Sequence, residues 1–212
     1  MDKKQIKQII VGLSKPSKMP CHGYSIPAKE CKTGGKLRDV PGSVCSSCYA
    51  CKGNYRFSNV EKALYKRLDA IHNPQWVEAM AYAIVNSKFF RWHDSGDIQN
   101  LEHLKKICEV CRLTPDTKHW LPTKEKKIIK EYILKIGNLP KNLTVRLSAY
   151  MVDSAPPKYA ETIINDQVRF STVHSETVKY GRLCPAPTQG NKCLDCRACW
   201  DKRIKIISYK KH

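Results

Sequence analysis

Long apolar runs are missing from this 212-residue sequence. Its first residues, MDKKQIKQIIVGLSK, contain only a five-residue apolar stretch and no small-residue cleavage site, so they do not resemble a secretory signal peptide. No segment approaches the ~20 apolar residues that a membrane-spanning helix needs. Linkers rich in Gly and Ser are also missing, so we expect a single domain over residues 1–212. The sequence therefore predicts a cytoplasmic protein without a membrane partner.

Acidic residues are scarce: 19 Asp and Glu stand against 38 Lys and Arg, which gives a net charge of +19. A field of that sign favours polyanions, so nucleic acid is a candidate partner. Neither a helix-turn-helix pattern nor a short polybasic tail accompanies the charge. In KEKKIIKEYILK the lysines interleave with Glu opposite an apolar helix face. Part of the excess of positive charge is therefore explained by lysines that form the solvent-exposed faces of helices.

Cysteine, by contrast, is plentiful, and nine of the eleven lie in two groups near the chain ends. A C-x-x-C step places two thiolates on one tight turn, where both can reach a zinc ion or neighbouring irons of a cluster. A disulfide framework is the alternative, but it belongs to a secreted context. In a reducing cytosol the pattern predicts metal binding. The two groups are Cys21, Cys31, Cys45, Cys48 and Cys51, and Cys184, Cys193, Cys196 and Cys199.

The spacing of these cysteines favours iron over zinc. Zinc ribbons pair two C-x-x-C knuckles across a modest loop, and zinc fingers add histidines that are not found at that spacing here. Cys193, Cys196 and Cys199 instead repeat the C-x2-C-x2-C rhythm of bacterial ferredoxins, and Cys184-Pro185 adds a distant fourth thiolate before a proline. We expect one or two [4Fe-4S] clusters, with zinc as the alternative.

Two other cysteines fit a structural role. Cys108 and Cys111 share the three-and-four spacing of a buried helix face with Leu101, Leu104 and Ile107, so they are expected in the core. The pattern leaves open whether Cys21 and Cys51 are metal ligands.

The middle of the chain alternates strand and helix patterns. Successive strands start some two dozen residues apart, which is the period of β-α units and implies parallel neighbours. The sequence predicts an α/β protein, either a partial (β/α) barrel or an open parallel sheet, with Cys-rich N- and C-terminal extensions at 1–58 and 181–212 around a β-α core at 59–180. Strands are expected at 89–93, 119–121, 143–149 and 168–173, and helices at 59–72, 74–84, 98–112 and 124–136.

Polar residues follow the expected strands, at the edge where active sites of parallel sheets gather. A His-Asp pair at a strand end is costly to place without a partner or substrate. Ser95, Asp97 and Thr123 are equally well placed to cap the helices that follow. The candidate catalytic residues of this rim are His93, Asp94, Lys124, Ser148 and His174.

Several segments resemble a known family. SVCSSCYACKGNYRF, FFRWHDSGDIQ, WLPTKEK, NLTVRLSAYMVD and CPAPTQGNKCLDCRACW are similar to the gene product 88 proteins of bacteriophages and prophages. The resemblance implies a phage-encoded protein of the host cytoplasm with iron-sulfur character. It also implies which cysteines are metal ligands: Cys31, Cys45, Cys48, Cys184, Cys193, Cys196 and Cys199.

A more distant resemblance concerns the radical S-adenosylmethionine enzymes, through the C-x-x-C-Tyr-Ala step at Cys45. Those enzymes use C-x3-C-x2-C, which is replaced here by Cys31-x13-Cys45-x2-Cys48 or by Cys45-x2-Cys48-x2-Cys51. The resemblance implies S-adenosylmethionine as a candidate cofactor, with Ser95, Gly96 and Asp97 at the strand end that binds it. An enzyme acting on a nucleic acid or nucleotide, an electron-transfer protein and a zinc-stabilised nucleic-acid-binding protein all remain compatible with these features.

If the basic surface binds a polyanion, affinity for DNA or RNA should fall steeply as salt rises, because each neutralised phosphate releases counterions. A fluorescence titration with a labelled oligonucleotide at several salt concentrations measures the slope. Lysines that only solvate helices would give no binding even at low salt.

Overall fold

The structure is a computed structural model that describes residues 1–211. Its centre is a parallel β-sheet, which over the described chain has seven strands in the order β1-β2-β3-β4-β5-β7-β6. The α/β class and the open parallel sheet predicted from the sequence are therefore confirmed. The strands are β1 (Gly23–Tyr24), β2 (Phe89–Trp92), β3 (Lys118–Thr123), β4 (Leu143–Ser148), β5 (Arg169–His174), β6 (Arg182–Leu183) and β7 (Ile206–Lys210).

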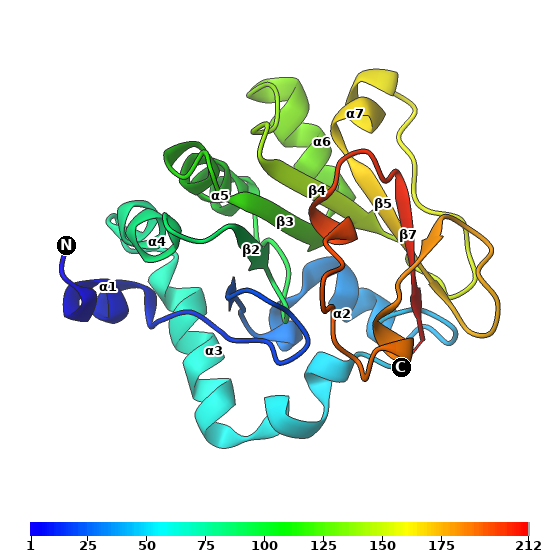
Figure 1. Cartoon of the computed structure of the whole chain (residues 1–212), viewed down its shortest axis with the longest axis horizontal. Helices are drawn as coiled ribbons and strands as arrows, with labels where there is room; N and C mark the ends of the chain where they lie inside the picture. The colour runs from blue at the N-terminus through cyan, green and yellow to red at the C-terminus, as the bar shows by residue number, and fades with distance from the viewer. Residues whose placement is uncertain (212) are drawn as a thin grey trace.

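Helices connect the first five strands in chain order. When neighbouring parallel strands follow one another in sequence, right-handed crossovers place the connecting helices on the same face. Figure 1 shows α4 to α7 along one side of the sheet, while α2 lies on the other side. The helices are α1 (Lys3–Ile10), α2 (Lys32–Arg38), α3 (Ser58–Ala70), α4 (Trp76–Ile84), α5 (Leu101–Leu113), α6 (Lys126–Lys135) and α7 (Thr162–Gln167). None of the helices described here has the length and apolar character needed to cross a bilayer.

The hydrophobic core fills the space between these helices and the sheet. Trp76 of α4 and Trp92 of β2 are fully buried, with ring centroids 6.1 Å apart. Cys108 and Cys111 of α5 are also fully buried and belong to this core, as their helical spacing predicted. Their position explains why a thiol at these two sites serves as a small apolar side chain.

The terminal segments are not extensions, which corrects the sequence-based prediction. Residues 1–58 supply β1 to one edge of the sheet, and residues 181–212 supply β6 and β7 to the other. β1 and β6 are two residues long, which is too short for an alternating pattern to reveal. Both cysteine groups are thereby attached to the sheet itself.

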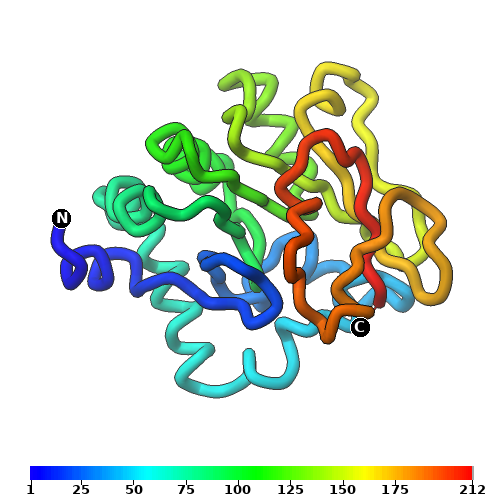
Figure 2. Tube along the Cα trace, viewed as in Figure 1, coloured from blue at the N-terminus to red at the C-terminus, as the bar shows by residue number. Residues whose placement is uncertain are grey.

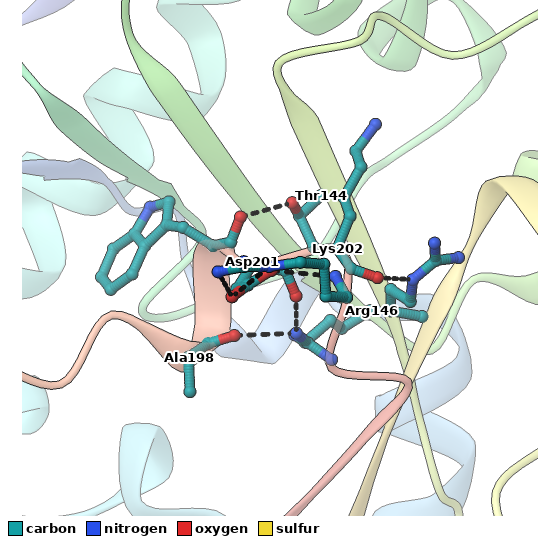
Figure 3. Close-up of polar contacts among 8 residues, drawn as sticks. Thr144, Arg146, Ala198, Asp201 and Lys202 are labelled. Carbon is teal, nitrogen blue, oxygen red and sulfur yellow. Dashed lines mark hydrogen bonds and ion pairs between the residues drawn. The ribbon is translucent and has the colours of Figure 1, made fainter.

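A buried arginine fixes the C-terminal segment against the sheet. Arg146 of β4 is fully buried and reaches the short 3-10 helix η5 (Ala198–Trp200) and the loop after it. Figure 3 shows the guanidinium beside the carbonyl oxygens of this loop. Within the described chain it donates to five backbone carbonyls at 2.9–3.4 Å, those of Cys199, Ala198, Asp201, Ile204 and Phe170.

A guanidinium has five N–H groups in a planar fork, so this arrangement uses its full donor capacity. The neighbouring hydroxyl of Thr144 donates to the carbonyl of Trp200 at 3.0 Å, and the Trp200 indole N–H donates to the carbonyl of Phe90 at 2.9 Å. The segment that carries Cys196 and Cys199 is therefore held on the sheet face opposite the helices.

Replacing Arg146 with Met should lower the free energy of unfolding by about 3–5 kcal/mol, because buried carbonyl oxygens would lose a charged donor. Chemical denaturation measures the change. Arg203→Met is the matched control from the same loop, since Arg203 pairs with Asp201 at 91% side-chain exposure and its loss should leave the stability nearly unchanged. If Arg146→Met does not fold, Arg146→Lys, which keeps the charge with fewer donors, should still be less stable than the wild type. Equal stability of the Met variants would contradict the role assigned to Arg146.

Candidate metal centres: two cysteine groups on the sheet

The four C-terminal cysteines line one small cavity. Cys184 follows β6, its N–H donates to the carbonyl of Ser208 on β7 at 2.9 Å, and the loop before β7 carries the other three. The cavity has a volume of about 20 Å³ and is bounded otherwise by mainly apolar residues. Its lining consists of Cys184, Cys193, Cys196 and Cys199 with Leu183, Pro185, Ala186, Ala198, Trp200 and Ile207. We call these four cysteines the C-terminal site.

Burial governs the chemistry of these thiols. It raises the pKa of Cys199 to about 12, although the Tyr209 hydroxyl, 3.2 Å from the sulfur, and the Arg146 charge both act in the opposite direction. Burial likewise raises the pKa of Cys193, and nearby Cys184 and Cys196 add to the shift. Protonated thiols grouped around one cavity become good ligands when a metal displaces their protons.

The other cysteine group lies around α2. Cys31 is the residue before this helix, and a Cβ atom added at Gly34 would lie 3.4 Å from the Cys45 sulfur and 3.8 Å from the Cys31 sulfur. Glycine at position 34 therefore leaves room for both thiols on one side of the helix. We call Cys31, Cys45, Cys48 and Cys51 the N-terminal cysteine group.

Two carboxylates lie beside this group. Glu125 accepts hydrogen bonds from the backbone N–H of Thr33 at 2.7 Å and from its hydroxyl at 2.8 Å, which ties α2 to the end of β3. Asp97 accepts from the Thr123 hydroxyl at 2.6 Å and from the N–H of Lys124 at 2.8 Å. Burial raises the pKa of Asp97 to about 6. Burial also raises the pKa of Cys31, and Asp97 is the next largest cause.

Arg91 of β2 lies near the thiols of the C-terminal site, because its charge acts on Cys193 and Cys199. It is largely buried, pairs with Asp94 at 2.7 Å and stacks over the Trp120 ring at 4.6 Å. Its charge lowers the pKa of Cys21, although burial dominates and raises that pKa to about 11. On its other side Asp94 accepts hydrogen bonds from Tyr49 and Tyr55, which flank the N-terminal cysteine group.

Cys21 belongs near the C-terminal site, not near α2. The N–H of Cys193 donates to the carbonyl of Lys18 at 2.9 Å, so the loop that carries Cys21 packs on the loop that carries Cys193. Figure 2 shows these two segments, blue and orange, side by side.

The candidate rim residues all lie at the carboxyl ends of strands, but each has different partners. Asp94 contacts Arg91, the Ser148 hydroxyl accepts from Ser171 at 3.1 Å, and a His174 ring nitrogen lies 2.7 Å from the Ser208 hydroxyl. The N–H of Lys124 bonds to Asp97. The rim residues therefore take part in separate local networks.

His93 is the most unusual of them. Its backbone has φ = 55°, and its buried ring lies 5.2 Å from the ring of His103 on α5. Neither ring nitrogen has a hydrogen-bond partner within the described chain. A left-handed backbone at a non-glycine residue is strained, and here it turns the ring toward the helix layer.

The three residues expected to bind a cofactor, Ser95, Gly96 and Asp97, each make structural contacts within the chain. The Ser95 hydroxyl donates to the carbonyl of Ile26 at 3.0 Å, and Gly96 has φ = 85° with no room for a Cβ against Ile26. The Asp97 carboxylate joins the end of β2 to the end of β3. The alternative prediction, that Ser95, Asp97 and Thr123 cap the helices that follow them, is wrong. Asn100 caps α5, and α6 has no side-chain cap.

The geometry limits which metal the thiols suit. Over residues 1–211, no three His, Cys, Asp or Glu side chains are grouped so that they could hold a metal ion. Four thiolates that share one zinc ion each lie about 2.3 Å from it. Thiolates of a four-iron cluster each bind a separate iron and stand farther apart. The four cysteines of the C-terminal site line one cavity, but as they stand they do not form a site for a single metal ion.

The sequential parallel sheet and its two cysteine groups define an α/β protein with paired thiol-rich sites. Its family follows from its sequence: the family described as Gene product 88 matches residues 2–202. Because the match covers almost the whole chain, the protein belongs to the phage gene product 88 family, and that prediction from the sequence motifs is confirmed. Among curated proteins and among solved structures, nothing matches this chain.

Acid should destabilise the fold through His93. Burial, followed by the charge of Arg91, lowers the pKa of His93 to about 3, whereas an unfolded histidine titrates near 6.5. The unfolded chain therefore binds the extra proton, so stability is complete above about pH 6.5 and declines by up to ~1.4 kcal/mol per pH unit toward pH 3.

Asparagine tolerates the left-handed backbone at position 93. His93→Asn should therefore reduce the number of protons taken up on unfolding by about one, which flattens the dependence of stability on pH. Denaturant unfolding between pH 4 and pH 7 measures the slope. His22→Asn, at an exposed position, is the control and should leave the slope as in the wild type. An unchanged slope in His93→Asn would remove His93 as the source of acid sensitivity.

Proposed function

We propose that this phage-family protein binds a [4Fe-4S] cluster on Cys184, Cys193, Cys196 and Cys199 and that it serves a redox role. One observation carries the proposal: segments from β6 and from the loop before β7 bring all four thiols to a single cavity. Three of them repeat the C-x2-C-x2-C step of bacterial ferredoxins, and the distant fourth cysteine precedes that step instead of following it.

The surroundings of this site suit an anionic metal-thiolate centre. Arg146 binds the carbonyl of Cys199, and the charges of Arg91 and Arg197 both act on the adjacent Cys21 thiol. Trp200 and Ile207 supply apolar walls. Nearby cations and limited solvent access are the levers by which a protein tunes a cluster's reduction potential. When bound, the cluster would supply one-electron chemistry.

The size of the cavity adds a condition. A space of about 20 Å³ holds little more than one water molecule, so the cysteine loop has to widen when a four-iron cluster binds. The loops at 184–199 carry few regular hydrogen-bonded elements apart from η4 (Ala186–Thr188) and η5, which permits that adjustment.

Zinc-dependent stabilisation of a nucleic-acid-binding protein is the second candidate, because the chain carries a net charge of +19. It requires the same thiols to close on one ion. The two functions differ in colour, since a cluster absorbs broadly near about 400 nm and zinc does not.

Anaerobic purification followed by iron, sulfide and zinc analysis tests the proposal. We expect iron and acid-labile sulfide in near-equal amounts, with about four of each for every cluster. Cys193→Ala and Cys199→Ala should lose the absorbance of the C-terminal cluster. The matched control is Cys108→Ala, which changes a buried core cysteine and should keep the full iron content. Stoichiometric zinc without sulfide would overturn the iron assignment.

A further inference from the structure

We infer that an open pocket beside the end of β2 binds a single-stranded nucleic acid by stacking a base on tyrosine. The pocket has a volume of about 480 Å³, within the ~300–1,000 Å³ range of ligand sites. It deepens the second candidate function, whose nucleic acid it assigns to a site and to single strands, and it requires no metal. Its lining consists of Ser47, Tyr49, Lys52, Gly53, Asn54 and Tyr55.

Two short 3-10 helices shape the pocket. They are η2 (Tyr49–Cys51) and η3 (Gly53–Arg56), and Lys52 between them has an extended backbone with φ = −134° and ψ = 172°. Gly53 then has φ = 52°, a conformation that favours glycine, and turns the chain into η3. Figure 1 shows this segment as the cyan loop at the lower edge of the molecule, before α3. The pocket therefore lies on a surface loop that is attached to the sheet by its side chains.

A mostly buried ion pair holds the two tyrosine rings in place. The rings meet edge to face, with centroids 5.9 Å apart and an angle of 62° between them. The Tyr49 hydroxyl donates to the backbone carbonyl of Asp94, and the Tyr55 hydroxyl donates to the Asp94 carboxylate. Arg91 pairs with that carboxylate at 2.7 Å. Because the hydroxyl ends are anchored, the rings are oriented before a ligand arrives, which lowers the entropy cost of binding.

The anchored rings still present surface to a ligand. Tyr49 remains 40% exposed although its hydroxyl is hydrogen-bonded to Asp94. Phe57, which follows η3 directly, is 58% exposed. Unpaired bases stack on exposed aromatic rings with little dependence on sequence, because every base has a π-face. The loop thus offers a stacking platform for a base.

The charge of the loop suits the phosphates of a nucleic acid. Residues 43–57 include Lys52 and Arg56, both exposed, and no Asp or Glu. Asp94, which the tyrosines contact, is neutralised by Arg91. The chain as a whole carries a net charge of +19, which attracts polyanions. Aromatic and basic residues that alternate along one exposed segment are the composition by which proteins bind single strands.

A duplex fits this arrangement less well. Its bases are stacked on one another inside the helix, so a base reaches a tyrosine only after it is extruded from the stack, which costs free energy. A single strand presents its bases without that cost. We therefore expect a preference for single strands over duplexes.

Binding of oligonucleotides to the full-length protein tests the inference. Fluorescence anisotropy at low salt should show binding of labelled oligo(dT) and oligo(U) of about 12 nucleotides, a length within the usual site sizes for single strands. Duplex DNA of the same length should bind more weakly. The tighter of the two single strands tells whether DNA or RNA is the source, since only RNA carries the 2′-hydroxyl.

Substitution of Tyr49 tests the stacking contact. Tyr49→Ala should weaken binding of the single strand by roughly 5- to 100-fold, the effect of losing one stacked base. Tyr49→Phe keeps the ring and should bind much more tightly than Tyr49→Ala. Tyr82→Ala is the matched control, because Tyr82 is an exposed tyrosine of α4 outside the pocket and its loss should leave the affinity unchanged.

Substitution of Lys52 tests the phosphate contact at an exposed position where folding is not at stake. Lys52→Ala should reduce the slope of log affinity against log salt by about 0.7, the value for one phosphate of a single strand. Lys88→Ala is the control, because Lys88 is exposed at the opposite end of β2 from Asp94 and should leave the slope unchanged.

Equal binding of single strands and duplex, with Tyr49→Ala unchanged, would overturn the stacking pocket and leave contacts to the backbone only. Absence of binding by both oligonucleotides at low salt would overturn the inference outright. Anisotropy does not depend on metal content, so either failure leaves the cluster proposal standing. Protein without iron that still binds single strands through Tyr49 would support the pocket while the cluster proposal fails.

Discussion

The buried guanidinium of Arg146 is the interaction on which the C-terminal half depends. It is a charge inside the protein whose solvation comes from backbone carbonyl oxygens instead of water. Because those carbonyls belong to the segment at 198–204, this segment has one favourable position relative to β4. That position sets where Cys199 lies. The segment leads directly into β7, which pairs in parallel with β5.

The two cysteine groups differ in their electrostatic surroundings. Arginines lie close to the C-terminal site, whereas the buried carboxylates Asp97 and Glu125 lie beside the N-terminal group. Cations stabilise a nearby thiolate and carboxylates destabilise it, so the two groups of thiols differ in how readily they lose their protons.

The sequence predicted the elements that carry strong patterns. β2 to β5 and α3 to α6 have apolar runs or helical periodicity, and Cys108 and Cys111 were found in the core for that reason. β1 and β6 carry no pattern, because two residues cannot show one. The carboxyl edge was predictable from strand order, but the contacts of His93 depend on its left-handed backbone and on α5, which is a tertiary effect. Spacing alone also left Cys51 unassigned.

The strand order has a consequence for biosynthesis. β6 touches the sheet only through β7, with Arg182 opposite Ile207 and Leu183 opposite Ser208, although β7 is made later. While residues 206–210 are still inside the ribosome, Cys184 has no strand to hold it and the four-thiol cavity does not exist. The N-terminal cysteines and β1 to β5 emerge long before. The C-terminal site must then wait for the finished chain, whereas the residues around α2 are available for folding during translation.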